Sequence, residues 1–175
     1  MKRPLAAIRI HHAAGNRQRG WLEIDGHMIP VALGRGGILA NKREGDGGTP
    51  RGTFHPCRLW WRADRHARPR TFLPVRIISS RDAWCEDPAD RHYNQPVQLA
   101  AGQGGDRLRR DDHLYDFIIE IDHNTRPRVA GRGSAVFLHL ARAQFAPTAG
   151  CVAMTRSAML QLLQRLGPRT KIIIE

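Results

Sequence analysis

Cysteine, acidic residues and long apolar runs are all scarce in this sequence. The 175 residues include three cysteines, at positions 57, 85 and 151, and no Cys-x-x-Cys pair. An odd number of thiols without paired spacing argues against a disulfide framework and favours reduced cysteines. No apolar stretch approaches the ~18 residues that a membrane-spanning helix needs, so no membrane span is expected.

The N-terminal segment MKRPLAAIRIHHAAG begins with basic residues but lacks an apolar core. Its uncharged run, residues 4–8, ends at Arg9, and two histidines follow. The apolar region of a secretory signal peptide takes about 7–15 residues. We therefore expect a cytoplasmic protein from the chain as given, or a periplasmic one if the N-terminus is incomplete.

Basic residues outnumber acidic ones by 28 to 16, which gives a formal net charge of +12. This balance is compatible with nucleic acid, anionic membranes or small acidic substrates. The segment RLWWRADRHARPR, residues 58–70, interleaves two tryptophans with basic side chains, as single-strand binding patches do. A strand followed by a solvated arginine loop is the interpretation we favour, and no nucleic-acid partner is expected.

Short segments rich in Val, Ile, Phe and Trp alternate with Gly, Pro, Asp and Asn clusters. This pattern predicts a mainly β sandwich or barrel with long loops. The expected strands are residues 5–11, 21–24, 28–33, 53–61, 72–78, 115–122, 135–141 and 171–174. Asp25-Gly26 between two of them predicts a type I′ hairpin turn.

One short helix is predicted after residue 155. Thr155 can cap it, Gly167 and Pro168 can end it, and its apolar face consists of Met159, Leu162, Leu163 and Leu166. We expect a single domain over residues 1–175. Residues 79–112 form a long polar insertion, which predicts a loop that could act as a lid.

Cofactor and metal motifs are absent. GDGGTPRG, residues 45–52, lacks the Gly-Lys-Ser/Thr ending of a P-loop, and GRGS, residues 131–134, has no dinucleotide fingerprint around it. Nine histidines occur without a His-Glu-x-x-His or paired Cys/His spacing. We therefore expect tight turns at the glycines, no cofactor and no metal.

A histidine and a cysteine lie close together in HLARAQFAPTAGCVAM, residues 139–154. Cys151 follows a small-residue turn just before Thr155, and proximity to a helix N-terminus is expected to lower its thiol pKa. One interpretation is a catalytic pair in which His139 accepts the thiol proton. The other is a core histidine and a buried thiol, since cysteine is among the most buried residue types.

Five stretches carry a resemblance to a known family. They are KREGDGGTPRGTF (42–54), DAWCEDPADRHYNQPV (82–97), YDF (115–117), GRGSAVFLHLA (131–141) and PTAGCVAM (147–154). Together and in this order they resemble the L,D-transpeptidase catalytic domain, the YkuD family. The resemblance implies a YkuD-like β fold with one short helix after the catalytic cysteine. It implies Cys151 as nucleophile, His139 as base, Gly150 at the oxyanion turn and Thr148 at the Ser/Thr position of the motif.

The resemblance also suggests residues that line the pocket. Substrate binding is expected of Thr148, Ser134, Arg132, Tyr115 and Trp84, with Tyr93 and Asn94 also lining the pocket. A backbone carbonyl near residues 133–134 is expected to orient the imidazole of His139. Cys85, next to Trp84, is expected to be a packed thiol.

Three positions depart from the family pattern. Ala149 stands where many members have histidine, Ala153 where many have arginine, and Leu140 where glycine often follows the base. A reshaped pocket is therefore expected, in which another arginine binds the substrate carboxylate. The candidates near the motif are Arg132, Arg142 and Arg156.

The activity implied by the resemblance is acyl transfer at the bond between diaminopimelate and D-alanine in a peptidoglycan stem tetrapeptide. An amine acceptor would make the enzyme an L,D-transpeptidase, and water would make it an L,D-carboxypeptidase. The expected partner is a stem peptide or a soluble muropeptide. The alternative is a basic binding module for nucleic acid or the anionic wall, with a degenerate active site. The sequence leaves the oligomeric state open.

Overall fold

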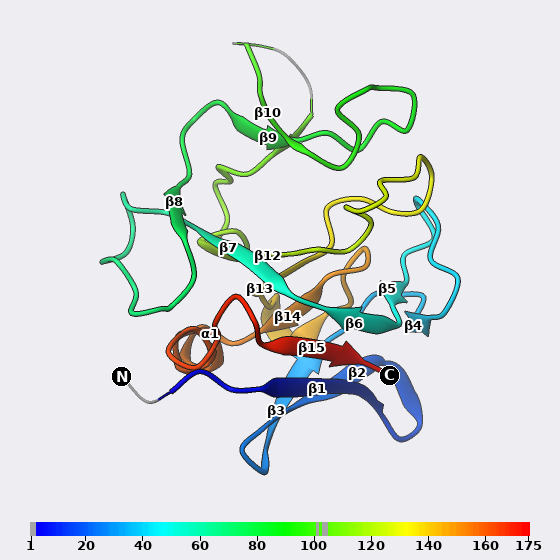
Figure 1. Ribbon diagram of the computed structural model, residues 1–175, viewed down its shortest axis with the longest axis vertical. Coiled ribbons are helices and arrows are strands. Elements are labelled where there is room, and N and C mark those ends of the chain that lie inside the picture. The colour runs from blue at the N-terminus through cyan, green and yellow to red at the C-terminus, as the bar shows by residue number, and fades with distance from the viewer. Residues whose placement is uncertain (1–2, 101, 103–104) are drawn as a thin grey trace.

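A strongly curled sheet forms the centre of the molecule (Figure 1). The computed structural model describes residues 3–100, 102 and 105–175. The main sheet has the strand order β6-β15-β1-β2-β3-β14-β13-β12-β7-β8. Its strands are β1 (Ala7–Ala13), β2 (Asn16–Ile24), β3 (His27–Ala32), β6 (Gly52–Phe54), β7 (Pro56–Trp61), β8 (Val75–Ile77), β12 (Phe117–Ile121), β13 (Phe137–Leu140), β14 (Val152–Met154) and β15 (Lys171–Ile174). The mainly β prediction is confirmed.

The connection between β6 and β7 draws the two ends of the sheet together. β6 pairs with β15 at one end of the strand order, whereas β7 pairs with β12 near the other. Only His55 separates the two strands, so the predicted continuous strand 53–61 is in fact two strands with a bend. The backbone N–H of His55 donates to Asp122 Oδ1 at 2.7 Å, outside the ladder. Pro56, which has no N–H, then starts the new pairing.

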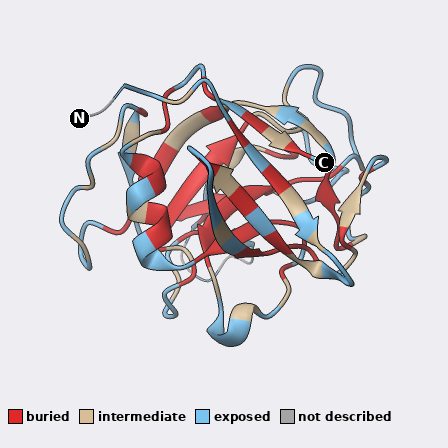
Figure 2. Cartoon of the chain, turned by 90° about the horizontal axis from the view of Figure 1, so that it is seen from below, coloured by how far each residue is buried: buried red, intermediate tan, exposed pale blue. Residues whose placement is uncertain are grey.

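The central strands are buried on both faces (Figure 2). Because side chains alternate along a strand, β7 directs Leu59 and Trp61 into the larger core and Trp60 into a second apolar cluster. The side chains of β13 alternate in the same way, with Leu138 in the larger core and Phe137 in the second cluster. The molecule therefore has two cores, one on each side of these strands.

The helix α1 (Arg156–Leu163) covers the larger core. Thr155 caps it as predicted, since its side-chain oxygen accepts the N–H of Ala158 at 3.3 Å. The apolar face is buried, but α1 ends at Leu163, and Leu166 is buried in the turn that follows. The hairpin turn is confirmed as well: Asp25 and Gly26 both have positive φ and link β2 to β3.

Residues 79–112 are not a plain loop. They contain β9 (Asp82–Trp84), β10 (Pro96–Gln98) and β11 (Asp106–Arg107), which form a three-stranded sheet in the order β10-β9-β11. The long insertion predicted here thus contains a small sheet that was not predicted, because strands of two or three residues carry no periodic signal. Residues 101, 103 and 104 of the predicted lid lie outside the described residues.

The β9–β11 sheet covers the second core. Trp84 from β9 stacks edge-on against Phe137 of β13 at 4.9 Å between ring centroids and against Trp60 of β7 at 6.5 Å. Each such pair contributes about 0.5–1.5 kcal/mol beyond its buried area. Further short elements are β4 (Ile38–Leu39), paired with β5 (Thr49–Pro50), and the 3-10 turn Ala143–Phe145.

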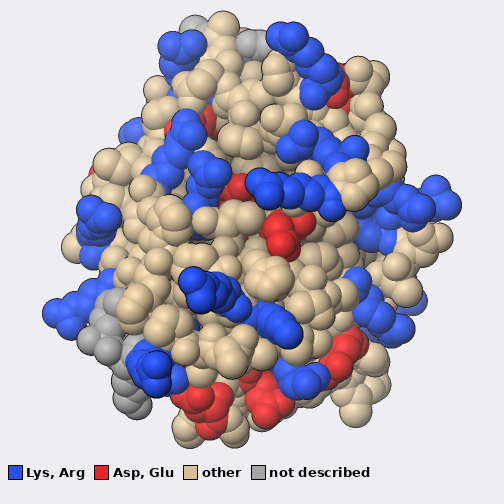
Figure 3. All heavy atoms as spheres, viewed as in Figure 1, with Lys and Arg blue, Asp and Glu red and all other residues tan. Residues whose placement is uncertain are grey.

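The two tryptophans of residues 58–70 are buried: Trp60 is fully buried, and Trp61 is 8% exposed. They cannot serve as stacking platforms for bases, so the strand interpretation is confirmed. On the face in Figure 3, Lys and Arg are dispersed, with Asp and Glu among them. No helix in the described part of the chain is long and apolar enough to cross a membrane.

Asn94 ties the β9–β11 sheet to the start of β13. Its side-chain oxygen accepts the Trp84 indole N–H at 3.0 Å and the Ala135 backbone N–H at 3.1 Å. Its amide nitrogen donates to the carbonyls of His123 and Asn124 at 3.1 and 3.0 Å. The neighbouring Tyr93 hydroxyl accepts the backbone N–H of Gly133 at 3.0 Å. The Tyr93–Asn94 pair is therefore a structural clamp, which the sequence did not reveal.

Replacing Asn94 by alanine should lower the free energy of unfolding by about 2–4 kcal/mol, because it leaves several buried polar groups without partners. Urea denaturation measures the change. Asn16→Ala, at the exposed start of β2, is the matched control and should shift stability by about 0.5 kcal/mol or less. Equal effects of the two substitutions would contradict the clamp.

Candidate active site

The strand register brings Cys151 and His139 to one face of the sheet. β13 and β14 run parallel, with Leu138 opposite Val152 and His139 opposite Ala153. Cys151 lies two residues before Ala153 and therefore points to the same side as His139. Both side chains line one cavity of about 420 Å³, and they are only 7% and 6% exposed. The predicted pair is thus brought together on the face that the β9–β11 sheet covers.

The Cys151 thiol is neutral and held by backbone groups. Its Sγ donates to the carbonyl of Ala135 at 3.2 Å and accepts the N–H of Phe137 at 3.4 Å. Burial raises its pKa to about 12, with the negative charges of Asp106 and Glu86 adding to the shift. The expected lowering of the thiol pKa is therefore wrong. The strand β14 separates Cys151 from α1, so the helix N-terminus does not act on the thiol.

The His139 ring is neutral, with one nitrogen free. Its Nδ1 lies 2.9 Å from the carbonyl of Leu140, which can only accept, so Nδ1 carries the proton. Burial lowers the His139 pKa to about 4. The Nε2 atom makes no hydrogen bond to any residue that the structure describes, and it is available as a base. The Tyr115 ring packs against the imidazole at 5.3 Å.

The orienting carbonyl is that of Leu140, not one near residues 133–134 as expected. The Gly133 carbonyl instead accepts from the Asn124 side chain at 3.0 Å. Leu140 thus occupies the position after the base where the family often has glycine, and its backbone fixes the tautomer of His139.

The turn before Cys151 is fixed by Thr148 and Gly150. The Thr148 hydroxyl accepts the N–H of Gly150 at 3.0 Å and donates to the carbonyl of Cys151 at 2.6 Å. Gly150 has φ +146°, and a Cβ there would lie 2.8 Å from the carbonyl oxygen of Gly48. Only glycine fits this position. Thr148 therefore positions the cysteine in addition to lining the cavity.

Three arginines line the Cys151 cavity: Arg35, Arg110 and Arg142. Arg142 was among the candidates, whereas Arg35 and Arg110 were not predicted, because they lie far from the motif in sequence. The small Ala149 and Ala153 also line this cavity. Their short side chains leave more of the cavity open than histidine or arginine at these positions would.

Arg132 and Arg156 do not line the Cys151 cavity, so these two candidates are corrected. The Arg132 guanidinium hydrogen-bonds to the side chain of Asn41, and Arg156 is exposed at the start of α1. Arg110 is partly engaged by its ion pair with Asp112 at 2.6 Å. The Arg142 guanidinium makes no hydrogen bond or ion pair within the described residues and is free to bind a ligand.

The other predicted binding residues divide into two groups. Tyr115 lines the Cys151 cavity as expected. Ser134 does not, because its hydroxyl donates to Glu44 at 2.7 Å. Trp84 lines a neighbouring cavity with Cys85. No group of three or more His, Cys, Asp or Glu side chains within the described ranges is arranged to hold a metal ion.

A comparison with protein families matches residues 7–174 to the YkuD model, the L,D-transpeptidase catalytic domain. The chain belongs to this family. The match spans nearly the whole chain, so the resemblance drawn from the five motifs is confirmed, and an L,D-transpeptidase-family function in peptidoglycan is supported. No curated protein and no solved structure matched the chain.

Alkylation should report the neutral state of Cys151. In a chain carrying Cys57→Ser and Cys85→Ser, the rate with iodoacetamide should rise about 100-fold between pH 7 and pH 9, because the thiolate fraction grows tenfold per pH unit below the thiol pKa of about 12. Mass spectrometry of the quenched protein gives the rate. A rate that levels off near neutral pH would mean a thiolate–imidazolium pair instead.

Proposed function

We propose that this domain catalyses cysteine-dependent acyl transfer at the diaminopimelate–D-alanine bond of peptidoglycan stem tetrapeptides. The observation that carries the proposal is the single cavity that Cys151 and His139 both line, with the Nε2 of His139 unpartnered among the described residues. Family membership supplies the substrate class. The nucleophile, the base and the bond cleaved are our assignments.

The neutral state of both residues indicates when the thiol is activated. A thiol with a pKa near 12 beside an imidazole with a pKa near 4 holds its proton in the free enzyme. Proton transfer to His139 therefore accompanies attack on the substrate carbonyl. The C–S bond forms, and the amide C–N bond breaks as His139 passes the proton to the leaving nitrogen of D-alanine. A thioester remains on Cys151.

Intact-protein mass spectrometry after mixing with a diaminopimelate-containing tetrapeptide tests this proposal. The mass of the tripeptidyl thioester should appear in the wild-type protein and in the Cys57→Ala control. It should be absent from Cys151→Ala and reduced by about 100-fold or more in formation rate in His139→Ala. A thioester that forms without Cys151 would refute the assigned nucleophile. No thioester in any variant would favour a binding module with a degenerate site.

Arg142 is the proposed partner of a donor carboxylate. Stem peptides carry several carboxylates, and an arginine binds each in a bidentate, charge-assisted manner. Among the three arginines of the Cys151 cavity, Arg142 is the one whose guanidinium has no partner in the described chain. Arg110 is held by Asp112 and lies over the Tyr115 ring at 5.2 Å.

Replacing Arg142 by glutamine should lower kcat/KM for the tetrapeptide about tenfold, mainly through KM, because a charge-assisted contact is lost. Steady-state release of D-alanine gives both constants. The matched control is Arg156→Gln, which changes an exposed arginine outside the cavity and should leave both constants unaltered. A similar loss in the two variants would point to general electrostatics instead of a specific contact.

A further inference from the structure

Two carboxylates lie at the boundary between two cavities. The second cavity has a volume of about 680 Å³ and is walled by the β9–β11 sheet and the turn between β9 and β10. Among the residues that the structure describes, Glu86 and Asp106 alone line both this cavity and the Cys151 cavity. The two spaces therefore meet at this pair, and a molecule in the second cavity would approach Cys151 past these carboxylates.

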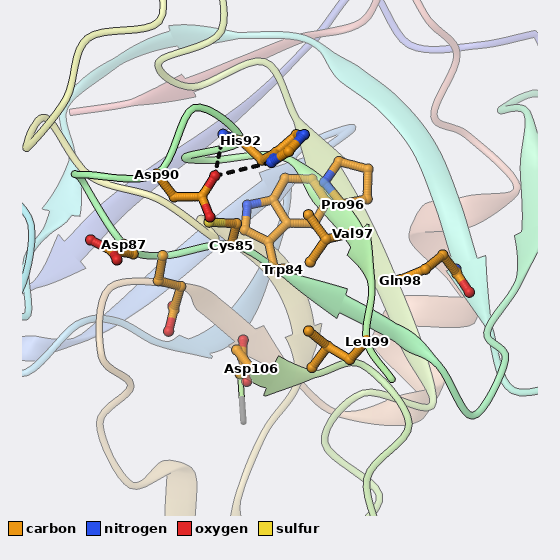
Figure 4. A pocket seen from close by; sticks show the side chains of 12 residues that line it. Trp84, Cys85, Asp87, Asp90, His92, Pro96, Val97, Gln98, Leu99 and Asp106 are labelled. Atoms are coloured by element: carbon orange, nitrogen blue, oxygen red, sulfur yellow. Dashed lines mark hydrogen bonds and ion pairs between the residues drawn. The ribbon is translucent and has the colours of Figure 1, made fainter. Parts of the chain in front are cut away.

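The two cavities differ in charge. The Cys151 cavity contains three arginines together with the shared Glu86 and Asp106, whereas the described lining of the second has neither Lys nor Arg and carries four carboxylates, those of Glu86, Asp87, Asp90 and Asp106. Figure 4 shows Asp106 across the cavity from Asp90, with the apolar Trp84 and Leu99 nearby. The chain has a net charge of +12, so an acidic cavity is unusual in it. The carboxylates favour a cationic ligand, and the apolar side chains favour a ligand with an apolar part.

The boundary carboxylates make no ion pair within the described structure, although the charge of Arg110 favours the ionised form of Asp106. Glu86 makes no hydrogen bond or ion pair there, and Asp106 has one long contact, with the Tyr115 hydroxyl at 3.5 Å. Glu86 is exposed over much of its surface, yet desolvation of its carboxyl and the charges of Asp106 and Glu44 raise its pKa to about 7. Burial raises the pKa of Asp106 as well. An ammonium group would relieve the repulsion between them.

An unpartnered base faces the same junction. His139 is 94% buried, and its Nδ1 donates to the Leu140 carbonyl. Its Nε2 has no partner among the described residues, and its side chain lines the cavity that Glu86 and Asp106 border. This nitrogen can receive a proton from a nucleophile that arrives after the thioester has formed. The base and the acidic pair thus point to a second, amine-bearing reactant.

We infer that the second cavity is the acceptor subsite and that Glu86 and Asp106 bind the ammonium group of the acyl acceptor. This inference rests on the proposed acyl transfer and favours an amine over water as acceptor. The ammonium gives one proton to Glu86, and the free amine attacks the thioester carbonyl. The C–N bond forms, the C–S bond breaks, and the second proton passes through His139 to the Cys151 thiolate, which becomes the thiol again. Glu86 returns its proton to solvent.

Partition of the thioester tests this inference. The protein is incubated with the tetrapeptide donor and increasing D-methionine, and mass spectrometry measures the ratio of D-methionine adduct to hydrolysed tripeptide. Glu86→Gln and Asp106→Asn should each raise the D-methionine concentration for half-maximal adduct about tenfold, whereas Glu86→Asp should restore most of the wild-type value. The matched control is Glu23→Gln on β2, which lines neither cavity and should behave as wild type.

The outcomes separate the two proposals. A wild-type thioester that reacts only with water at every D-methionine concentration would overturn the acceptor subsite and leave the acyl transfer standing. Unchanged half-saturation in both boundary variants, with thioester yield and melting temperature retained, would do the same. Failure of the wild-type protein to form a thioester would overturn the proposed function itself.

Discussion

Burial of the central strands on both faces is the constraint on which the rest of this structure depends. Strands β7, β12 and β13 contribute alternate side chains to a large core under α1 and to a smaller core under the β9–β11 sheet. A strand covered on one face only would leave Cys151 and His139 in water. The covering sheet is held by Asn94 and Trp84, so the burial of Cys151 and His139 depends on how residues 79–112 pack.

This burial determines the protonation states of Cys151 and His139. Removing both groups from water favours the neutral thiol and the neutral imidazole, the opposite of the thiolate–imidazolium state found where a cysteine lies at a helix N-terminus. A neutral resting pair resists adventitious oxidation and alkylation. The reactive form then depends on the bound substrate, which couples reactivity to recognition.

Much of the fold was predictable, and the reasons are local. The strand at Lys171–Ile174 and the Thr155 cap were assigned within their observed bounds, since β-branched runs and caps act through neighbouring residues. The break at His55, the three short strands of residues 79–112 and the Leu140 carbonyl were missed, because each is determined by a partner distant in sequence or by backbone geometry. The same applies to Arg35, Arg110 and Glu86, which reach the site only through the tertiary fold.

The position of β15 has a consequence for how the chain acquires its structure. This strand lies between β6 and β1, to which it pairs antiparallel and parallel, although it is the last strand of the chain. Until β15 has been synthesised, both neighbours present unpaired edges, and the curled sheet cannot close. Loss of this one strand would therefore open the sheet between β1 and β6.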